Sequence, residues 1–162
     1  MEFEIRRAQH FDAAKIIESH RRSIREVCSK DYNQQQIAVW SGRNFRDEVW
    51  QQTMDTDFVW VISNSRNDIY GFGHLKIKLD KQAVVAGLYF IPEVMGKGFG
   101  KKLIELIILE CRQQGVKNVT LSSTITAKSF YEKMGFQCLG DLSSVEIGGE
   151  KIDCYEMKIT LS

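Results

Sequence analysis

The sequence predicts a single mixed-sheet domain of the α/β (α+β) class, and three observations support this prediction. The chain has 162 residues, a length that fits one domain. Hydrophobic residues make up 43% and there is a single Pro, so the chain can build a core and is not of disordered composition. Segments with strand character come first, and alternating strand and helix segments follow. We therefore expect one domain over 1–162, with no repeat or linker.

The first third of the chain predicts a strand followed by helices. The strand is expected over 2–8, and an amphipathic helix follows with Asp12 as its N-cap. A second, short helix is predicted after Asn33, because Gln36 three residues later completes a capping-box pattern. One or two further helical turns are expected over 44–54.

The middle of the chain predicts three strands. They are expected over 57–63, 69–79 and 82–91. In the second half of 69–79, apolar and polar side chains alternate, so one face of that strand is apolar. The third segment is almost continuously apolar, which fits a central strand buried on both faces.

The last part alternates between helix and strand. Gly115 and Gly135 are natural stops for two helices, and the final strands are expected to be joined over Gly148–Gly149. The expected elements are a helix to about Gln114, a strand over 116–123, a short helix over 126–134, and closing strands over 136–142 and 151–161.

Charge and residue usage exclude several classes of protein. With 22 Lys and Arg against 21 Asp and Glu, the net charge of +1 gives no basic field for nucleic acid. No apolar run reaches about 18 residues and there is no signal-peptide pattern, so we expect a cytoplasmic protein with no membrane partner. The four cysteines form no CxxC motif and no zinc spacing with the three histidines, so no metal is expected.

The stretch EVMGKGFGKKLIELI, over 93–107, combines three glycines with the start of a helix. It lacks the GxxxxGK[ST] spacing of a Walker A loop, and its third glycine is misplaced for the dinucleotide GxGxxG fingerprint. A plain flexible connection is the alternative. A helix that begins near Gly100 exposes unpaired N–H groups and a partial positive charge, and Lys97, Lys101 and Lys102 add charge. Together these features predict a site for a diphosphate.

Two motifs in this chain resemble those of the GNAT superfamily of acetyl-CoA-dependent N-acetyltransferases. Gly98 and Gly100 match the loop signature Q/R-x-x-G-x-G/A. Five residues match the second signature, N-x-x-A-x-x-F-Y-x-x-x-G-F: Ala127, Phe130, Tyr131, Gly135 and Phe136. The order of elements also fits, so the resemblance covers nearly the whole chain. Two positions depart from the family pattern: Met95 replaces the usual Gln or Arg, and Thr124 replaces the frequent Asn.

The resemblance implies a fold and a cofactor site. The fold would be a central mixed, mostly antiparallel twisted sheet of about six to seven strands, flanked by helices. Pantetheine would lie in a V-shaped opening beside the strand that ends at Phe90, where it would pair with backbone at Leu88, Tyr89 and Phe90. The pyrophosphate would contact Gly96, Lys97, Gly98, Phe99, Gly100 and Lys101. The hydroxyl of Thr124 is available either to the cofactor or to a helix N-cap.

The resemblance also implies direct attack of a primary amine, on a small molecule or a protein, on the thioester of acetyl-CoA. Tyr131 would donate a hydrogen bond to the departing sulfur. The amine needs a base, and His74 on the neighbouring strand is the candidate. Glu26 and Asp31 are interpreted as solvated charges.

Other aromatic and basic residues fall in the region that shapes the acceptor pocket of such enzymes, where they either line the pocket or pack elsewhere: Arg21, Arg22, Tyr32, Trp40 and Trp50. The acceptor itself is not identified, and a homodimer is left open. The alternative function is a non-catalytic module that binds acyl-CoA.

Overall fold

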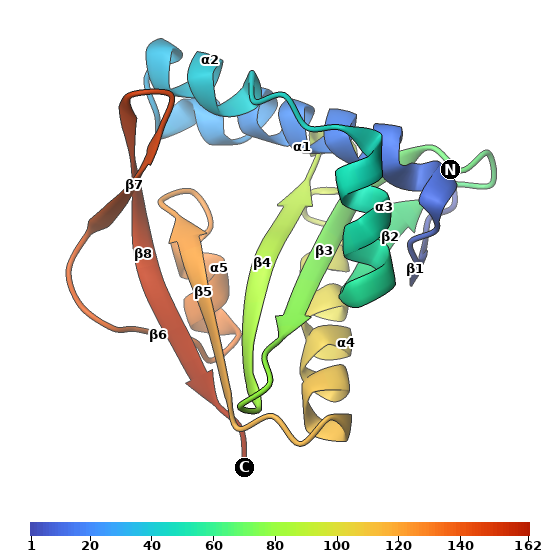
Figure 1. The fold of residues 1–162 in the computed structure, drawn as a ribbon. Coiled ribbons are helices and arrows are strands. Elements are labelled where there is room, and N and C mark those ends of the chain that lie inside the picture. Colours follow the sequence, from blue (N-terminus) through green and yellow to red (C-terminus); the bar gives the residue numbers. More distant parts are fainter.

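Alternating apolar side chains build one mixed β-sheet with helices on both faces (Figure 1). The computed structural model describes residues 1–162. The strands are β1 Glu4–Arg7, β2 Phe58–Ser63, β3 Ile69–Ile77, β4 Gln82–Phe90, β5 Asn118–Thr124, β6 Gln137–Cys138, β7 Ser143–Ile147 and β8 Glu150–Thr160. The helices are α1 Ala13–Glu26, α2 Gln34–Ser41, α3 Asp47–Thr56, α4 Phe99–Gln113 and α5 Lys128–Lys133. None of these helices has the length and apolar character that crossing a bilayer requires.

The strand order is β1-β2-β3-β4-β5-β8-β6, and β7 pairs with β8 off this path. Every pair is antiparallel except β4 with β5, which is parallel. The sheet is therefore mixed and mostly antiparallel, as expected, and it has eight strands where about six to seven were expected. The fold class is confirmed.

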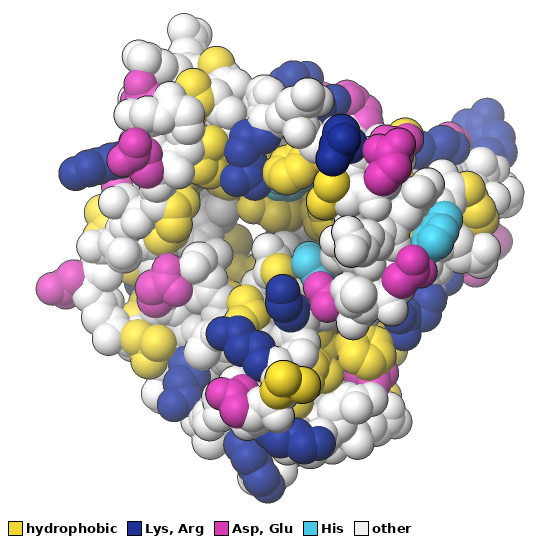
Figure 2. Space-filling view, viewed as in Figure 1, with side chains coloured by type: hydrophobic (Ala, Val, Ile, Leu, Met, Phe, Trp, Pro, Cys, Tyr) yellow, Lys and Arg dark blue, Asp and Glu magenta, His cyan; other side chains and the backbone are white.

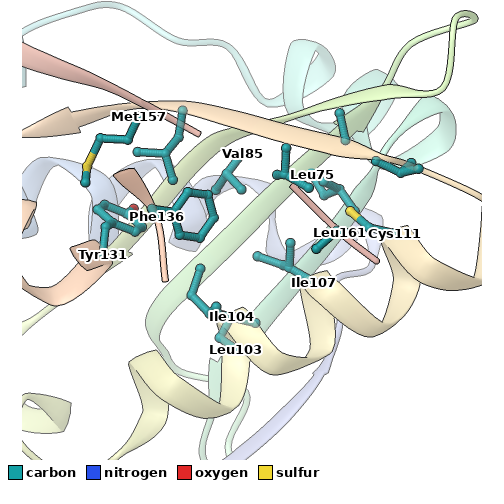
Figure 3. Close-up of a cluster of buried hydrophobic side chains, with 14 of the residues drawn as sticks. Leu75, Val85, Leu103, Ile104, Ile107, Cys111, Tyr131, Phe136, Met157 and Leu161 are labelled. Atoms are coloured by element: carbon teal, nitrogen blue, oxygen red, sulfur yellow. The ribbon is translucent and has the colours of Figure 1, made fainter. Parts of the chain in front are cut away.

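The main core lies between the sheet and α4 (Figure 3). Leu103, Ile104, Ile107 and Cys111 of α4 are buried at the helical spacing that the sequence predicts. They point toward side chains of the sheet, among them Leu75 of β3. Two smaller clusters on the opposite face pack α1, α2 and α3 against the sheet. Helices thus cover both faces of the sheet.

The two predicted helix starts differ in their outcome. Asn33 forms the expected capping box: its side chain accepts from the Gln36 N–H at 2.8 Å, and the Gln36 side chain accepts from the Asn33 N–H at 2.9 Å. Asp12 precedes α1 but does not cap it. Its fully buried carboxylate accepts two hydrogen bonds from Arg6, at 2.8 and 2.9 Å, and one from the Gln9 N–H. It therefore ties β1 to the segment before α1.

The strand β4 is central in the sheet, but it is not buried along its whole length as the sequence predicted. Its pairing with β3 shifts register between His74 and Leu75, so Ala86 is an extra, exposed residue in a β-bulge. Its parallel pairing with β5 covers only 82–84 against 118–120. Beyond that point the two strands diverge, and the rest of β4 lines an opening.

The closing strands also differ from the expectation over 136–142. Only Gln137–Cys138 forms a strand there, and a further strand, β7, follows it. The turn at Gly148–Gly149 joins β7 to β8, and both glycines have positive φ angles of 57° and 82°. The sequence analysis missed β7 because the segment SSVEI is mostly polar and exposed, so it carries no apolar alternation.

Candidate functional site

A cavity of about 390 Å³ lies where β4 and β5 diverge. It is lined from both faces of the sheet: by Ser23 of α1 and Val27 just after that helix, and by Phe130 and Tyr131 of α5. Figure 2 shows the face that carries α1, α2 and α3, and its surface is hollowed between β4 and β5. The cavity therefore passes between the two strands.

The loop before α4 offers a run of free backbone donors. The N–H groups from Gly96 to Lys101 have no hydrogen-bond acceptor in the protein, and the first N–H of the helix that is bonded is that of Lys102, to the Gly98 carbonyl at 3.2 Å. Gly96 and Gly98 have φ angles of 72° and 83°, in the left-handed region that favours glycine. This arrangement, with the positive end of the α4 dipole, suits a bound anion.

Gly100 is required for a different reason. A Cβ at this position would lie 2.9 Å from Cε1 of Phe130, closer than side-chain carbons pack. The missing side chain lets the first turn of α4 approach α5. The two motifs that the sequence analysis treated separately therefore meet at this contact.

The edge of β4 forms the wall of the cavity that faces β5. Leu88, Tyr89 and Phe90 all line it, and they pair with β3 on their other side. Because β5 has diverged, this edge has no neighbouring strand. Its backbone groups are available to an extended ligand that contains amides.

The two positions that depart from the expected motifs both line the cavity. Met95 is half exposed and offers no polar group. The hydroxyl oxygen of Thr124 accepts from the Ala127 N–H at 3.1 Å, so it holds the turn into α5 and keeps its own proton for a ligand. Thr126, which the sequence analysis did not single out, has a buried hydroxyl without a partner. Such a group marks a polar point that a ligand can satisfy.

Tyr131 reaches the cavity from α5, as the motif predicts. Its ring is 5% exposed and packs edge-on against Phe130 and Phe136, with centroids 5.3 and 5.7 Å away. No group in the protein hydrogen-bonds its hydroxyl. Burial raises the pKa of Tyr131 well above its usual value, and nearby Tyr89 raises it further. The phenol is therefore a protonated donor at neutral pH.

The structure does not bring His74 to the cavity. Its Nε2 lies 2.7 Å from the Asp57 carboxylate, and its ring packs 5.7 Å from that of Trp50. No His, Asp or Glu side chain lines the cavity. The position of His74 therefore does not support the sequence-based hypothesis that this residue is the base.

The candidate acceptor residues are mostly engaged elsewhere. Arg22 forms ion pairs with Glu26 and Glu93, and Trp40 is buried in the small core beneath α2. Tyr32 donates to the Asp153 carbonyl at 2.6 Å and accepts from the Ile125 N–H at 2.9 Å. It fastens the segment before α2 to β8 and to the turn after β5. Sequence reasoning had no signal for this bridge, because its partners lie 93 and 121 residues away.

The divergent β4 edge and the free amides before α4 form a site that fits a long ligand with amide groups and an anionic group. The family model described as an acetyltransferase (GNAT) domain matches residues 28–161, and the chain belongs to this family.

Curated relatives include N-acetyltransferases, and a solved structure shares the fold. An uncharacterised N-acetyltransferase, YafP, of Escherichia coli K12 is 24% identical over 134 residues, which span 83% of this chain and 81% of YafP. A ribosomal protein bS18-alanine N-acetyltransferase of Haemophilus influenzae is 26% identical over 105 residues, 64% of this chain and 68% of that protein. The structure of PaiA N-acetyltransferase from Thermoplasma acidophilum in complex with coenzyme A superposes with a TM-score of 0.79 at 22% identity, covering 99% and 100% of the two chains.

Proposed function

We propose that the protein transfers the acetyl group of acetyl-CoA to a primary amine of a small molecule or a protein. The observation that carries this proposal is the run of free N–H groups at Gly96–Lys101 beside the unpaired edge of β4. The amides would bind the diphosphate, and backbone at Leu88–Phe90 would pair with the pantetheine arm. The hydroxyl of Tyr131 would donate to the leaving sulfur. When bound, the cofactor supplies an activated acetyl thioester.

The properties of the cysteines are consistent with direct transfer of the acetyl group to the amine. Burial raises the pKa of Cys28 to about 11, and the pKa of Cys154 is also raised by burial. These thiols stay protonated at neutral pH and are poor nucleophiles. The amine is then the group that attacks. Four free cysteines also support a reducing compartment such as the cytoplasm.

A second candidate function is a non-catalytic module that binds acyl-CoA. The absence of any His or carboxylate side chain from the cavity wall favours it. The free hydroxyl of Tyr131 favours the enzyme, because a module that only binds has no use for a donor to the sulfur.

Two measurements separate these functions. Calorimetry with coenzyme A tests the cofactor site, and thiol release from acetyl-CoA over a panel of amines tests transfer. The panel should pair small polyamines and arylalkylamines with short peptides that carry free N-termini. Binding with amine-dependent release supports the enzyme, and binding without release supports the module. No binding at millimolar coenzyme A would refute both.

A further inference from the structure

A solvent-exposed carboxylate on β8, that of Glu156, contacts a residue of the cavity wall. The hydroxyl of Ser122 donates to Oε1 of Glu156 over 2.6 Å, a short, charge-assisted hydrogen bond. Ser122 lines the cavity. Among the side chains that line the cavity, only that of Ser122 is hydrogen-bonded to a carboxylate, and this carboxylate is Glu156.

The register of the sheet holds this pair in place. Ser122 and Glu156 are directly opposite each other in the antiparallel β5–β8 pair. Leu121 and Met157, their neighbours along the strands, are buried in the α4 core. Because side chains alternate between faces, Ser122 and Glu156 point to the opposite face, toward α1 and α2.

Ser122 sits at the start of the opening. The last residue of β5 that pairs with β4 is Thr120, and Ser122 is two residues further on. When a serine hydroxyl donates a hydrogen bond to a carboxylate, the lone pairs of its oxygen remain free to accept another hydrogen bond. A donor inside the cavity, such as an amine N–H, can therefore meet Ser122 Oγ.

We propose that Ser122 and Glu156 form the proton relay of the transfer reaction, an inference that rests on the proposed function. The nitrogen lone pair forms the new bond to the acetyl carbon, and the carbon–sulfur bond breaks with its electron pair on sulfur. The nitrogen passes its proton to Ser122 Oγ, and the Ser122 proton moves to Glu156. Ser122 touches the amine, and Glu156 acts through it as positioning residue and proton acceptor.

The relay also fits the other groups at the site. Burial raises the pKa of the Tyr131 phenol, so Tyr131 stays protonated and does not take the proton of the amine. The thiol of Cys154 lies 3.7 Å from the same Glu156 oxygen. As a neutral thiol it is a weak donor there, and it leaves the charge of Glu156 in place.

The test compares Glu156→Gln, Ser122→Ala and the double variant with the wild type, using an amine that the wild type accepts. Because general bases contribute about 10²–10⁴-fold, we expect kcat to fall about 10²-fold in each single variant, with KM values changed less than about threefold. The double variant should be no slower than the slower single one, because the two groups act as a unit. Calorimetric affinity for coenzyme A should be unchanged in all three.

Glu146→Gln is the matched control, since it removes the same charge from an exposed residue on neighbouring β7. It should leave kcat unchanged. The relay is overturned if Glu156→Gln keeps wild-type kcat, if the two single losses multiply, or if Glu146→Gln slows turnover equally. A wild type that binds coenzyme A but acetylates no amine refutes the transferase proposal, and the relay with it.

Discussion

Replacing Tyr131 with Phe removes one hydroxyl and leaves its packing in place. The ring contacts with Phe130 and Phe136 need no oxygen, and the hydroxyl has no partner in the protein to lose. The free energy of unfolding should therefore change by less than about 0.5 kcal/mol. Any large fall in kcat would then come from the loss of the hydroxyl in the reaction and not from unfolding.

The size of that effect follows from what the phenol can do. Even at ordinary values, near 10 for a phenol and about 8.5 for a thiol, full proton transfer to a thiolate is uphill by about 2 kcal/mol. The raised pKa of Tyr131 increases this cost. A hydrogen bond to the developing charge is the better role, worth about 1.5–3 kcal/mol. That energy corresponds to a loss of about 10- to 150-fold in kcat.

The assay is steady-state thiol release with calorimetry of coenzyme A alongside. We expect kcat of Tyr131→Phe to fall and the coenzyme A affinity to stay constant. Tyr155→Phe is the control, because Tyr155 lies outside the cavity with its ring under the Lys128 ammonium at 4.9 Å. Wild-type kcat in Tyr131→Phe would refute the donor role.

Three further predictions concern the loop and a buried histidine. Gly98→Val should abolish measurable coenzyme A binding in calorimetry, because φ of 83° is strained for a β-branched residue and the open space at its Cβ adjoins the free amides; unchanged affinity would contradict this. Gly100→Ala should lower the free energy of unfolding in urea by about 1–3 kcal/mol through the clash with Phe130, and Phe130→Leu in the same chain should recover part of it. Burial lowers the pKa of His20 to about 4, below the value of about 6.5 of the unfolded chain. The unfolded state thus binds more protons between these pH values, so stability is full above pH 6.5 and falls by up to about 3 kcal/mol toward pH 4. Unfolding of His20→Phe should lack this part of the pH dependence.

The sequence predicted the parts of the site that depend on local patterns. Glycines directly before an apolar-periodic helix are a short-range signal, and the structure places Gly96 and Gly98 in the left-handed conformations that this pattern requires. The position of Tyr131 followed from a motif of similar length. Each of these features is encoded within about a dozen neighbouring residues.

The features that were missed depend on pairing between distant segments. The bulge at Ala86 is set by the register of β3 against β4, and apolar composition alone cannot show it. The contact between Ser122 and Glu156 joins residues 34 positions apart, through the register of β5 and β8. His74 was chosen for its residue type and strand parity, but its ring contacts the Asp57 carboxylate and does not line the cavity.

The divergence of β4 and β5 has a kinetic consequence. The resulting passage is lined from both sides of the sheet. Acetyl-CoA and the amine can therefore enter from opposite faces of the sheet and be bound at the same time. Initial-velocity plots at several fixed concentrations of the second reactant should then give intersecting lines. Coenzyme A and the acylated amine should each be able to dissociate first, so product release should have no obligatory order.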